Sequence, residues 1–304
     1  MQRLQRFLGF LLSCTGLALG CAHAPGAAFD PVSMDPPETD ADHPAALVEL
    51  AIDSHGAPMN AIVYQAPGAG PHPTVVLLHG FPGNERNLDL AHAMRRSGWN
   101  VVFFHYRGAW GSPGDFSFGH VLEDVASVVD WTLGAEAGAL RIDPETIALV
   151  GHSMGGFAAL RAGADHERVD CIVSLAGANF AGRGRAANAD PKAAAAIAAA
   201  LDQWRAPLAG TSGQALVAEI AGDVDHFDLV RQAPALAGKR LLLVAGTRDQ
   251  TTPPAEHHDP LVASLEAVGA TQLATRVFDA DHAFSGRRVA LAHLVTDWLG
   301  NRCP

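Results

Sequence analysis

The chain has 304 residues, of which 48% are hydrophobic and 17% charged, and its formal net charge is −11. A chain of this length and composition can bury one large core. The acidic balance argues against nucleic-acid binding, because a phosphate-binding surface needs concentrated lysine and arginine. No cofactor is expected, since neither a Walker loop nor a dinucleotide fingerprint accompanies the apolar segments.

The N-terminus has the features of a targeting segment. Arg3 and Arg6 precede an uncharged apolar stretch, residues 7–19, which is short for a membrane span and typical of a signal peptide. Residues 1–20 are therefore predicted as a signal peptide, and the protein is expected to be exported. Residues 21–45, rich in proline, alanine and acidic residues, are predicted to form a disordered tether.

Two outcomes of export stay open. The small residues before Cys21 approximate a bacterial lipobox, and lipidation there would tether the protein to the periplasmic face of a membrane. The same stretch also fits ordinary cleavage, which would leave the protein free in the periplasm or secreted. Cys14 follows a better lipobox but would leave the apolar region very short.

From residue 46 to the end, short apolar runs alternate with helical patterns, as is typical of an α/β fold with a mostly parallel sheet covered by helices on both faces. Strands are predicted near 47–53, 59–65, 74–79, 100–105, 146–150, 169–175, 240–245 and 273–278. Helices are predicted near 85–97, 119–134, 154–164, 256–268 and 287–299. The first two strands flank a His-Gly turn and are expected to form an antiparallel hairpin at the sheet edge.

The third predicted strand ends in the loop His79–Gly83, which reads HGFPG. Such a loop lets the backbone pass close to a catalytic serine. The N–H of Phe81 is therefore expected to serve as one donor of an oxyanion hole. The peptide before Pro82 is a candidate for the cis form. His79 is expected to hold the loop by hydrogen bonds.

The fifth predicted strand runs into Gly151–Gly155, which reads GHSMG and fits the GxSxG pattern of a nucleophile elbow. Glycines are needed because a serine on a sharp strand-to-helix turn has strained backbone angles and leaves no room for neighbouring side chains. Ser153 is therefore the candidate nucleophile, and the N–H of Met154 the second oxyanion donor. A serine that merely caps a glycine-rich helix is the structural alternative.

Residues 177–235 interrupt the alternation with an alanine-rich, helical insertion that carries Trp204 and is expected to form a lid. Trp110 and Trp204 are expected to line an apolar substrate pocket. Arg183 and Arg185 are candidates for binding an anionic substrate, although solvated surface charge is the commoner role of arginine. Three acidic residues late in the insertion are interpreted as surface charge: Asp223, Asp225 and Asp228.

A serine nucleophile needs a histidine base and an acid that orients it. Asp249 follows the strand at 240–245, and His282 follows the strand at 273–278, so both fall just past strand ends and in the chain order Ser, Asp, His. Asp279 and Asp281 lie too close to His282 in sequence to orient it. The competing histidines are less suitably placed: His257, His258 and His293. No metal site is expected, because adjacent histidines on a helix point in different directions.

The chain resembles the α/β-hydrolases through HGFPG at 79–83, GHSMGG at 151–156, GTRDQTTP at 246–253 and DHAF at 281–284. The similarity covers nearly everything from residue 47 onward. Bacterial members similar to this chain include prolyl-oligopeptidase-like, dienelactone-hydrolase-like and acyl-thioesterase-like enzymes. The resemblance implies a Ser-His-Asp triad that forms a covalent acyl intermediate with a small-molecule substrate.

The expected function is hydrolysis of carboxylic ester, thioester or related acyl bonds by Ser153, His282 and Asp249. Two alternatives stay open, an exported peptidase and a non-catalytic binding protein of the same fold.

A disulfide framework is not expected, because Cys171 begins an apolar strand and is interpreted as a buried thiol, while Cys303 lies in the tail.

Overall fold

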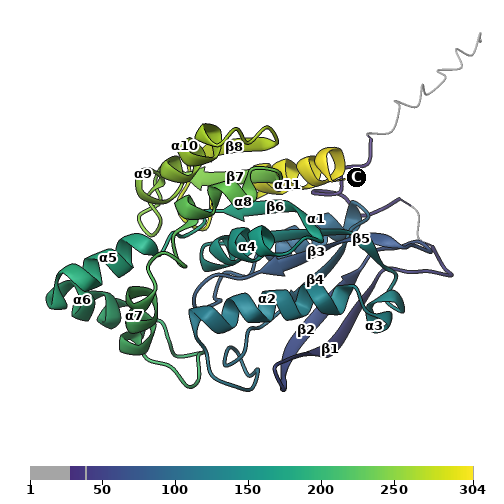
Figure 1. Ribbon diagram of the computed structural model, residues 1–304. Helices are drawn as coiled ribbons and strands as arrows, with labels where there is room; N and C mark the ends of the chain where they lie inside the picture. Colours follow the sequence, from purple (N-terminus) through teal and green to yellow (C-terminus); the bar gives the residue numbers. More distant parts are fainter. Residues whose placement is uncertain (1–27, 38–39, 304) are drawn as a thin grey trace, which may run out of the picture.

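The computed structural model describes residues 28–37 and 40–303 (Figure 1). The predicted signal peptide and the candidate lipidation site Cys21 lie outside these residues. Within them, no helix combines the length and the apolar character needed to cross a membrane.

The predicted α/β fold is confirmed by an eight-stranded sheet with the strand order β1-β2-β4-β3-β5-β6-β7-β8. The strands are β1 (Ala46–Ser54), β2 (Ala57–Gln65), β3 (His72–Leu78), β4 (Asn100–Phe104), β5 (Ile142–His152), β6 (Val169–Leu175), β7 (Arg240–Gly246) and β8 (Leu273–Phe278). β1 and β2 form the expected antiparallel hairpin, β2 pairs antiparallel with β4, and the remaining pairs are parallel.

Helices cover both faces of the sheet (Figure 1). The helices of the described residues are α1 (Leu88–Arg96), α2 (Phe118–Thr132), α3 (Ala135–Gly138), α4 (Met154–Asp165), α5 (Ala181–Ala189), α6 (Pro191–Asp202), α7 (Gly213–Gly222), η1 (Leu229–Gln232), α8 (Ala233–Leu236), α9 (Pro254–His257), α10 (Asp259–Ala267) and α11 (Arg288–Arg302). The predicted helix at 256–268 is divided into α9 and α10. The break falls at His258, next to Asp259 and Pro260, where the proline ring cannot donate a helical hydrogen bond.

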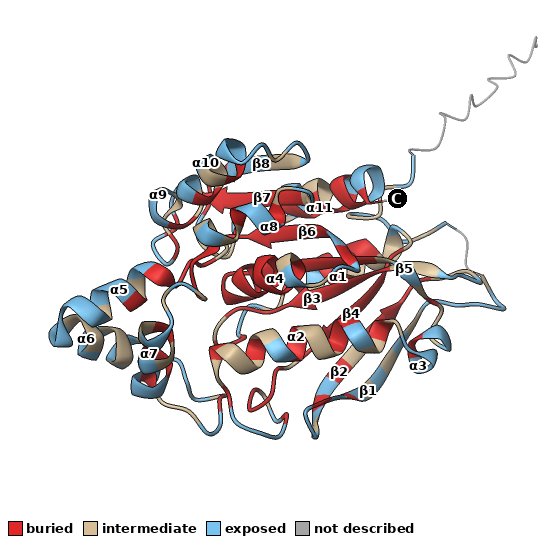
Figure 2. Cartoon of the chain, in the orientation of Figure 1, coloured by how far each residue is buried: buried red, intermediate tan, exposed pale blue. Residues whose placement is uncertain are grey.

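Successive residues of the central strands face opposite cores, because strand side chains alternate between the two faces. In β3, Val76 and Leu78 pack with α2 and α4, whereas Val75 and Leu77 pack with α1 and α11. The central strands are thus apolar on both faces, which explains their continuous hydrophobic sequences. Figure 2 shows the resulting band of buried residues through the sheet.

The helical insertion lies beyond the carboxyl ends of the parallel strands, where α5, α6 and α7 pack on one another (Figure 1). These helices are mostly exposed or half-buried, in contrast to the sheet (Figure 2). Asp228 corrects the expectation of surface charge, since it is 7% exposed and accepts hydrogen bonds from Asn179 and Arg185. Asp228 also caps η1 through the N–H of Val230.

Part of the predicted disordered tether is ordered. Asp30–Met34 forms a turn in which the Asp30 carbonyl accepts the N–H of Met34 at 2.9 Å. Arg96 at the end of α1 donates to the carbonyls of Pro31 and Val32, and Val32 packs against the core next to α1 and α11. The composition of this segment did not reveal these contacts, which depend on a distant arginine.

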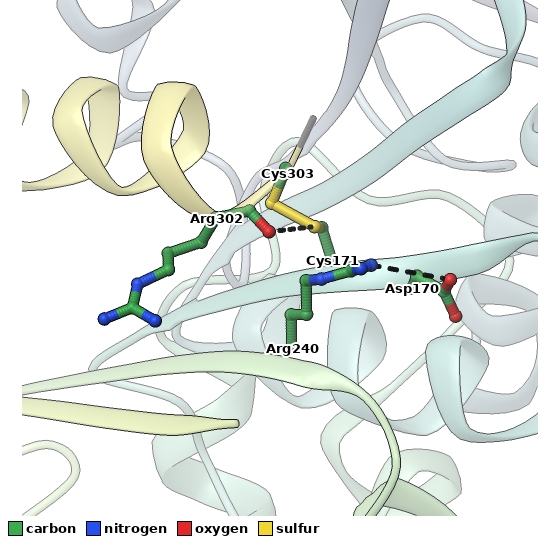
Figure 3. The surroundings of a disulfide bond; sticks show 5 residues. All are labelled: Asp170, Cys171, Arg240, Arg302 and Cys303. Carbon is green, nitrogen blue, oxygen red and sulfur yellow. Dashed lines mark hydrogen bonds and ion pairs between the residues drawn. A yellow bond between two sulfur atoms is a disulfide. The ribbon is translucent and has the colours of Figure 1, made fainter. Parts of the chain in front are cut away.

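The cysteine interpretation from sequence is wrong. Cys171 in β6 and Cys303 after α11 form a disulfide between residues 132 positions apart, with a Cα–Cα distance of 6.0 Å (Figure 3). The bond lies near the start of β6, at the opposite end of the sheet from the helical insertion. It ties the end of the C-terminal helix to β6 of the sheet.

Candidate active site

The backbone turn at Ser153 has the geometry of a nucleophile elbow. Ser153 connects β5 to α4 with φ 58° and ψ −117°, a strained conformation for a residue with a side chain. Its N–H donates to the Leu175 carbonyl at 2.9 Å, and its own carbonyl accepts the N–H of Ala178 at 3.0 Å. These bonds to β6 and the residues after it hold the turn in place.

The flanking glycines are required by close backbone packing. A Cβ at Gly151 would lie 2.0 Å from the Gly155 carbonyl oxygen, and a Cβ at Gly155 would lie 2.2 Å from the Leu78 carbonyl oxygen. Neither separation is sterically allowed. The GxSxG sequence is therefore the consequence of α4 lying directly on the ends of β3 and β5.

His282 and Asp249 meet as the sequence predicted. Asp249 follows β7 and His282 follows β8, and the neighbouring strand ends bring Asp249 Oδ2 to 2.7 Å from His282 Nδ1. Asp249 is 5% exposed, and its other oxygen accepts the N–H groups of Thr251 and Thr252 at 2.8 and 2.9 Å. Burial by itself would raise the pKa of Asp249, but the hydrogen bonds from His282 and Thr252 outweigh it and hold that pKa well below its usual value.

A cavity of about 430 Å³ contains Ser153 and His282 in its lining. The predicted residues Phe81 and Trp204 line it as well, as do Glu85 and Arg183. A smaller adjoining cavity of about 60 Å³ is lined by Ser153, Phe81 and Met154, by apolar side chains, and by Arg183 and two threonines. The structure thus places the candidate nucleophile, base and oxyanion donors around connected space.

The HGFPG loop passes directly against the elbow. A Cβ at Gly80 would lie 3.0 Å from Ser153 Cβ, so the glycine allows the loop to approach the serine. The N–H groups of Phe81 and Met154 donate to no backbone carbonyl within residues 40–303, which leaves both available to a ligand. The peptide between Phe81 and Pro82 is cis.

His79 lies beneath this loop as expected. It is fully buried, and its Nδ1 is 2.8 Å from the Gly80 carbonyl. Burial lowers the pKa of His79 to about 3, so the ring is neutral.

Trp110 does not line the cavity, which corrects the prediction of a substrate-binding role. Its Nε1 donates to the Pro82 carbonyl at 2.7 Å, and the guanidinium of Arg86 lies 4.2 Å from its ring centroid. The indole is oriented by these contacts and supports the outer side of the HGFPG loop. Two nearby aromatic residues, Phe116 and Phe157, lie in the core with 2% and 1% of their surface exposed.

Two residues of the site carried no prediction from sequence. His152 Nε2 donates to the His282 carbonyl at 2.8 Å, and the two rings lie 4.7 Å apart. Thr252 Oγ1 donates to Asp249 Oδ2 at 2.7 Å. His152 occupies the variable position before the serine in GxSxG, and Thr252 lies three residues after Asp249 in GTRDQTTP. Their closeness in sequence to predicted site residues was the only signal for these contacts.

The competing residues have other partners. Asp279 pairs with Arg248 on the surface, and Asp281 accepts the N–H of Ser285. His257 Nδ1 accepts the N–H of Asn179, and His293 lies 3.6 Å from Asp30. In residues 28–37 and 40–303, no group of three or more histidine, cysteine or acidic side chains has the arrangement of a metal site.

Solved structures with the same fold include hydrolases of several kinds. An esterase of Pyrococcus furiosus has 17% identity and a TM-score of 0.62, covering 86% of this chain and 93% of its own. An acylaminoacyl peptidase of Pyrococcus horikoshii has 14% identity and a TM-score of 0.64, covering 85% and 42%. A puromycin-hydrolyzing peptidase of Mycobacterium tuberculosis has 18% identity and a TM-score of 0.61, covering 87% and 40%. At these identities the likeness shows the fold alone.

Sequence comparison assigns the family. A 31.7 kDa protein of Escherichia coli, encoded in the traX-finO intergenic region, is 37% identical over 123 residues, and this chain spans 41% of its length. Residues 69–241, more than half of the chain, match the family described as serine aminopeptidase, S33. The chain therefore belongs to the serine aminopeptidase S33 family of α/β-hydrolases.

Proposed function

We propose that the protein is a serine hydrolase that cleaves carboxylic ester, thioester or related acyl bonds. The observation that carries this proposal is the 2.7 Å contact between Asp249 and His282 beside a cavity that also contains the strained Ser153. Such an arrangement gives a serine hydroxyl a base that is held in the required tautomer.

In the proposed mechanism, Ser153 Oγ attacks the substrate carbonyl while His282 Nε2 takes its proton. Asp249 accepts the Nδ1–H of His282 and stabilises the imidazolium that forms. The N–H groups of Phe81 and Met154 receive the negative oxygen of the tetrahedral intermediate. His282 then protonates the leaving group, and water releases the acyl group from Ser153 by the same steps in reverse.

The small cavity beside Ser153 favours short acyl chains. The small cavity has about 60 Å³ and adjoins both candidate oxyanion donors. Since a group the size of a water molecule needs about 10–15 Å³ of cavity volume, the cavity has room for roughly four such groups. Esters with acyl chains of about four carbons are therefore expected to be better substrates than long-chain esters.

A fluorophosphonate probe tests whether the serine is reactive. We expect labelling of the wild-type protein and none of Ser153→Ala, with far-ultraviolet circular dichroism showing that both are folded. The p-nitrophenyl esters from acetate to decanoate then measure chain-length preference. Folded wild-type protein that neither reacts with the probe nor hydrolyses any of these esters would instead be a binding protein.

An aminopeptidase is the second candidate function, and one feature of the cavity favours it. A peptidase of this type needs an acidic group for the substrate amine, and Glu85 lines the cavity that contains Ser153. Comparing alanine p-nitroanilide with its N-acetyl derivative distinguishes the two functions. An aminopeptidase should prefer the free amine and lose that preference in Glu85→Gln, whereas an esterase should cleave both anilides poorly.

We also propose that the protein works outside the cytoplasm. The Cys171–Cys303 disulfide supports this location, because such bonds persist mainly in oxidising compartments. Fractionation of a bacterium that expresses the full chain would locate the protein, and mass spectrometry of its mature N-terminus would distinguish lipidation of Cys21 from simple cleavage. Full-length protein in the cytoplasm would contradict export.

A further inference from the structure

Arg183 stands where separate spaces of the candidate site meet. It lines the cavity of about 430 Å³ that contains Ser153 and His282. It also lines the small cavity of about 60 Å³ that contains Ser153 and Met154, and a neighbouring cavity of about 480 Å³ beside Glu256 and His257. Because the small cavity includes both Ser153 and Arg183, only a few atoms of a substrate can separate them.

The guanidinium of Arg183 has spare hydrogen-bonding capacity. In the part of the chain that the structure describes, it makes one hydrogen bond, at 3.4 Å to the Thr251 carbonyl, and no ion pair. Arg185, two residues later, is instead paired with Asp228 at 3.0 Å. A guanidinium has five N–H donors, so most of those of Arg183 remain free for a ligand.

The surroundings of Arg183 make its positive charge costly. Arg183 lies in the first turn of α5, where the helix dipole is itself positive. Burial lowers the pKa of Arg183, and the nearby carboxylate of Glu256 offsets this only in part. The Phe180 ring, with its centroid 5.9 Å from the guanidinium, adds a weak favourable contact. An arginine still keeps its proton under such conditions. The charge would therefore be stabilised by an anion that enters the cavity.

We propose that Arg183 binds an anionic group of the substrate, a carboxylate or a group of similar shape, a few atoms from the scissile carbonyl. The proposal rests on the proposed function and narrows its substrate class. The planar guanidinium can hold two carboxylate oxygens at once, which fixes the orientation of the substrate above Ser153. Since the net charge of the chain is −11, the overall field of the protein does not attract an anion, and the local arginine must supply the selectivity.

Pairs of esters that differ only in charge test the proposal. For the acyl side, mono-p-nitrophenyl succinate is compared with its methyl ester; for the leaving-group side, 3-carboxyphenyl butyrate is compared with its methyl ester. Each pair is measured with the full chain as wild type, Arg183→Gln and Arg183→Lys, and Ser153→Ala supplies the background rate. The quantity of interest is the ratio of kcat/KM for the charged ester to kcat/KM for the neutral ester.

In at least one pair, Arg183→Gln should lower this ratio about 10- to 100-fold, as expected for a lost charge-assisted hydrogen bond, and should change the neutral ester less than about threefold. Arg183→Lys should retain part of the preference, because it keeps the charge but loses the planar fork. Arg205→Gln is the matched control. Arg205 follows α6 in the same insertion and pairs with Asp202. Its substitution by glutamine changes the net charge by the same amount as Arg183→Gln, but the ratio of kcat/KM for charged and neutral esters should stay that of the wild type.

The pair that responds identifies the side of the substrate that carries the anion. If both ratios are the same in wild type and Arg183→Gln while Ser153-dependent hydrolysis persists, the proposal is wrong and the proposed function stands. An equal loss of activity toward charged and neutral esters would also overturn it, because that result indicates a structural role through Thr251. Absence of any Ser153-dependent hydrolysis would instead refute the proposed function.

Discussion

Removing the Cys171–Cys303 disulfide should lower the free energy of unfolding by about 2–4 kcal/mol, the usual range for such bonds. The bond closes a loop across a separation of 132 residues. The loop-closure relation gives about 17 cal/mol/K for that length, or about 5 kcal/mol at 25 °C, as the ceiling. Residual structure in the unfolded chain reduces the value actually observed.

Urea unfolding followed by tryptophan fluorescence measures this loss. The comparison includes the wild type, the wild type with dithiothreitol, and the double variant Cys171→Ala/Cys303→Ala. With an m-value of about 3 kcal/mol/M, the midpoint should fall by roughly 1 M on reduction. The double variant should unfold at a similar urea concentration and should not respond to the reductant.

Ester hydrolysis provides the second readout, because the bond lies at the opposite end of the sheet from Ser153. We expect kcat/KM at 25 °C to stay within about twofold of the wild type in the double variant. A wild-type midpoint that does not change with dithiothreitol would refute the reasoning, provided that peptide mapping shows the two cysteines linked before reduction and free after it.

Further predictions concern the candidate site and its supports. Asp249→Asn should lower kcat by about 10³- to 10⁴-fold in the ester assay, because the amide favours the wrong tautomer of His282. In the wild type, the pKa of Asp249 is lower in the folded state than in the unfolded state. Its contribution to stability is therefore present above pH 3.8 and is lost as the pH falls below that value. Burial lowers the pKa of His152 to about 4 from 6.5, so the unfolded chain takes up a proton there before the folded chain does, and stability is lost as the pH falls from 6.5 to 4. His152→Gln should make the dependence of unfolding free energy on pH shallower by up to about 1.4 kcal/mol per pH unit over that range, measured by urea titrations; an unchanged slope would contradict this account. Gly155→Ala should prevent folding or destabilise the protein strongly, because its Cβ would lie 2.2 Å from the Leu78 oxygen. Gly182→Ala in α5, whose Cβ would have nothing within 4 Å, should be as stable as the wild type. Thermal unfolding of the two variants and the wild type measures this difference.

The sheet and the order of the site residues could be predicted because both depend on local patterns. Continuous apolar runs indicated strands buried on both faces, and parallel strands bring their carboxyl ends to one edge. Asp249 follows such a strand and His282 follows the next predicted strand along the chain, so their proximity could be inferred without knowing any contact. The steric demand of the elbow is also local, which is why GxSxG can be identified from the sequence.

What the sequence did not reveal depends on contacts between distant segments. Trp110 looks like any other aromatic residue near a site, and only the path of the HGFPG loop decides that its indole N–H binds Pro82. Asp228 is buried because Asn179 and Arg185 converge on it. Cys171 and Cys303 pair because α11 ends beside the start of β6, a relation that no pattern along the chain encodes.

Under the proposed function, the sheet supplies the residues for the reaction and the insertion supplies residues for substrate choice. Ser153 and Asp249 follow β5 and β7, which are packed on both faces, and His282 follows the neighbouring edge strand β8, so the sheet holds the candidate reacting groups in place. Arg183, Leu201 and Trp204 come from α5, α6 and the residues just after them, where most positions are exposed or half-buried although Leu201 itself reaches the core. Under the proposed function, we therefore expect substitutions in the insertion to change substrate preference at little cost in folding, whereas substitutions at the elbow should impair folding. Of the two arginines in α5, Arg185 is paired with Asp228, whereas Arg183 makes no ion pair within the described residues. Arg183 is therefore the position at which the proposed choice of substrate can be tested most directly.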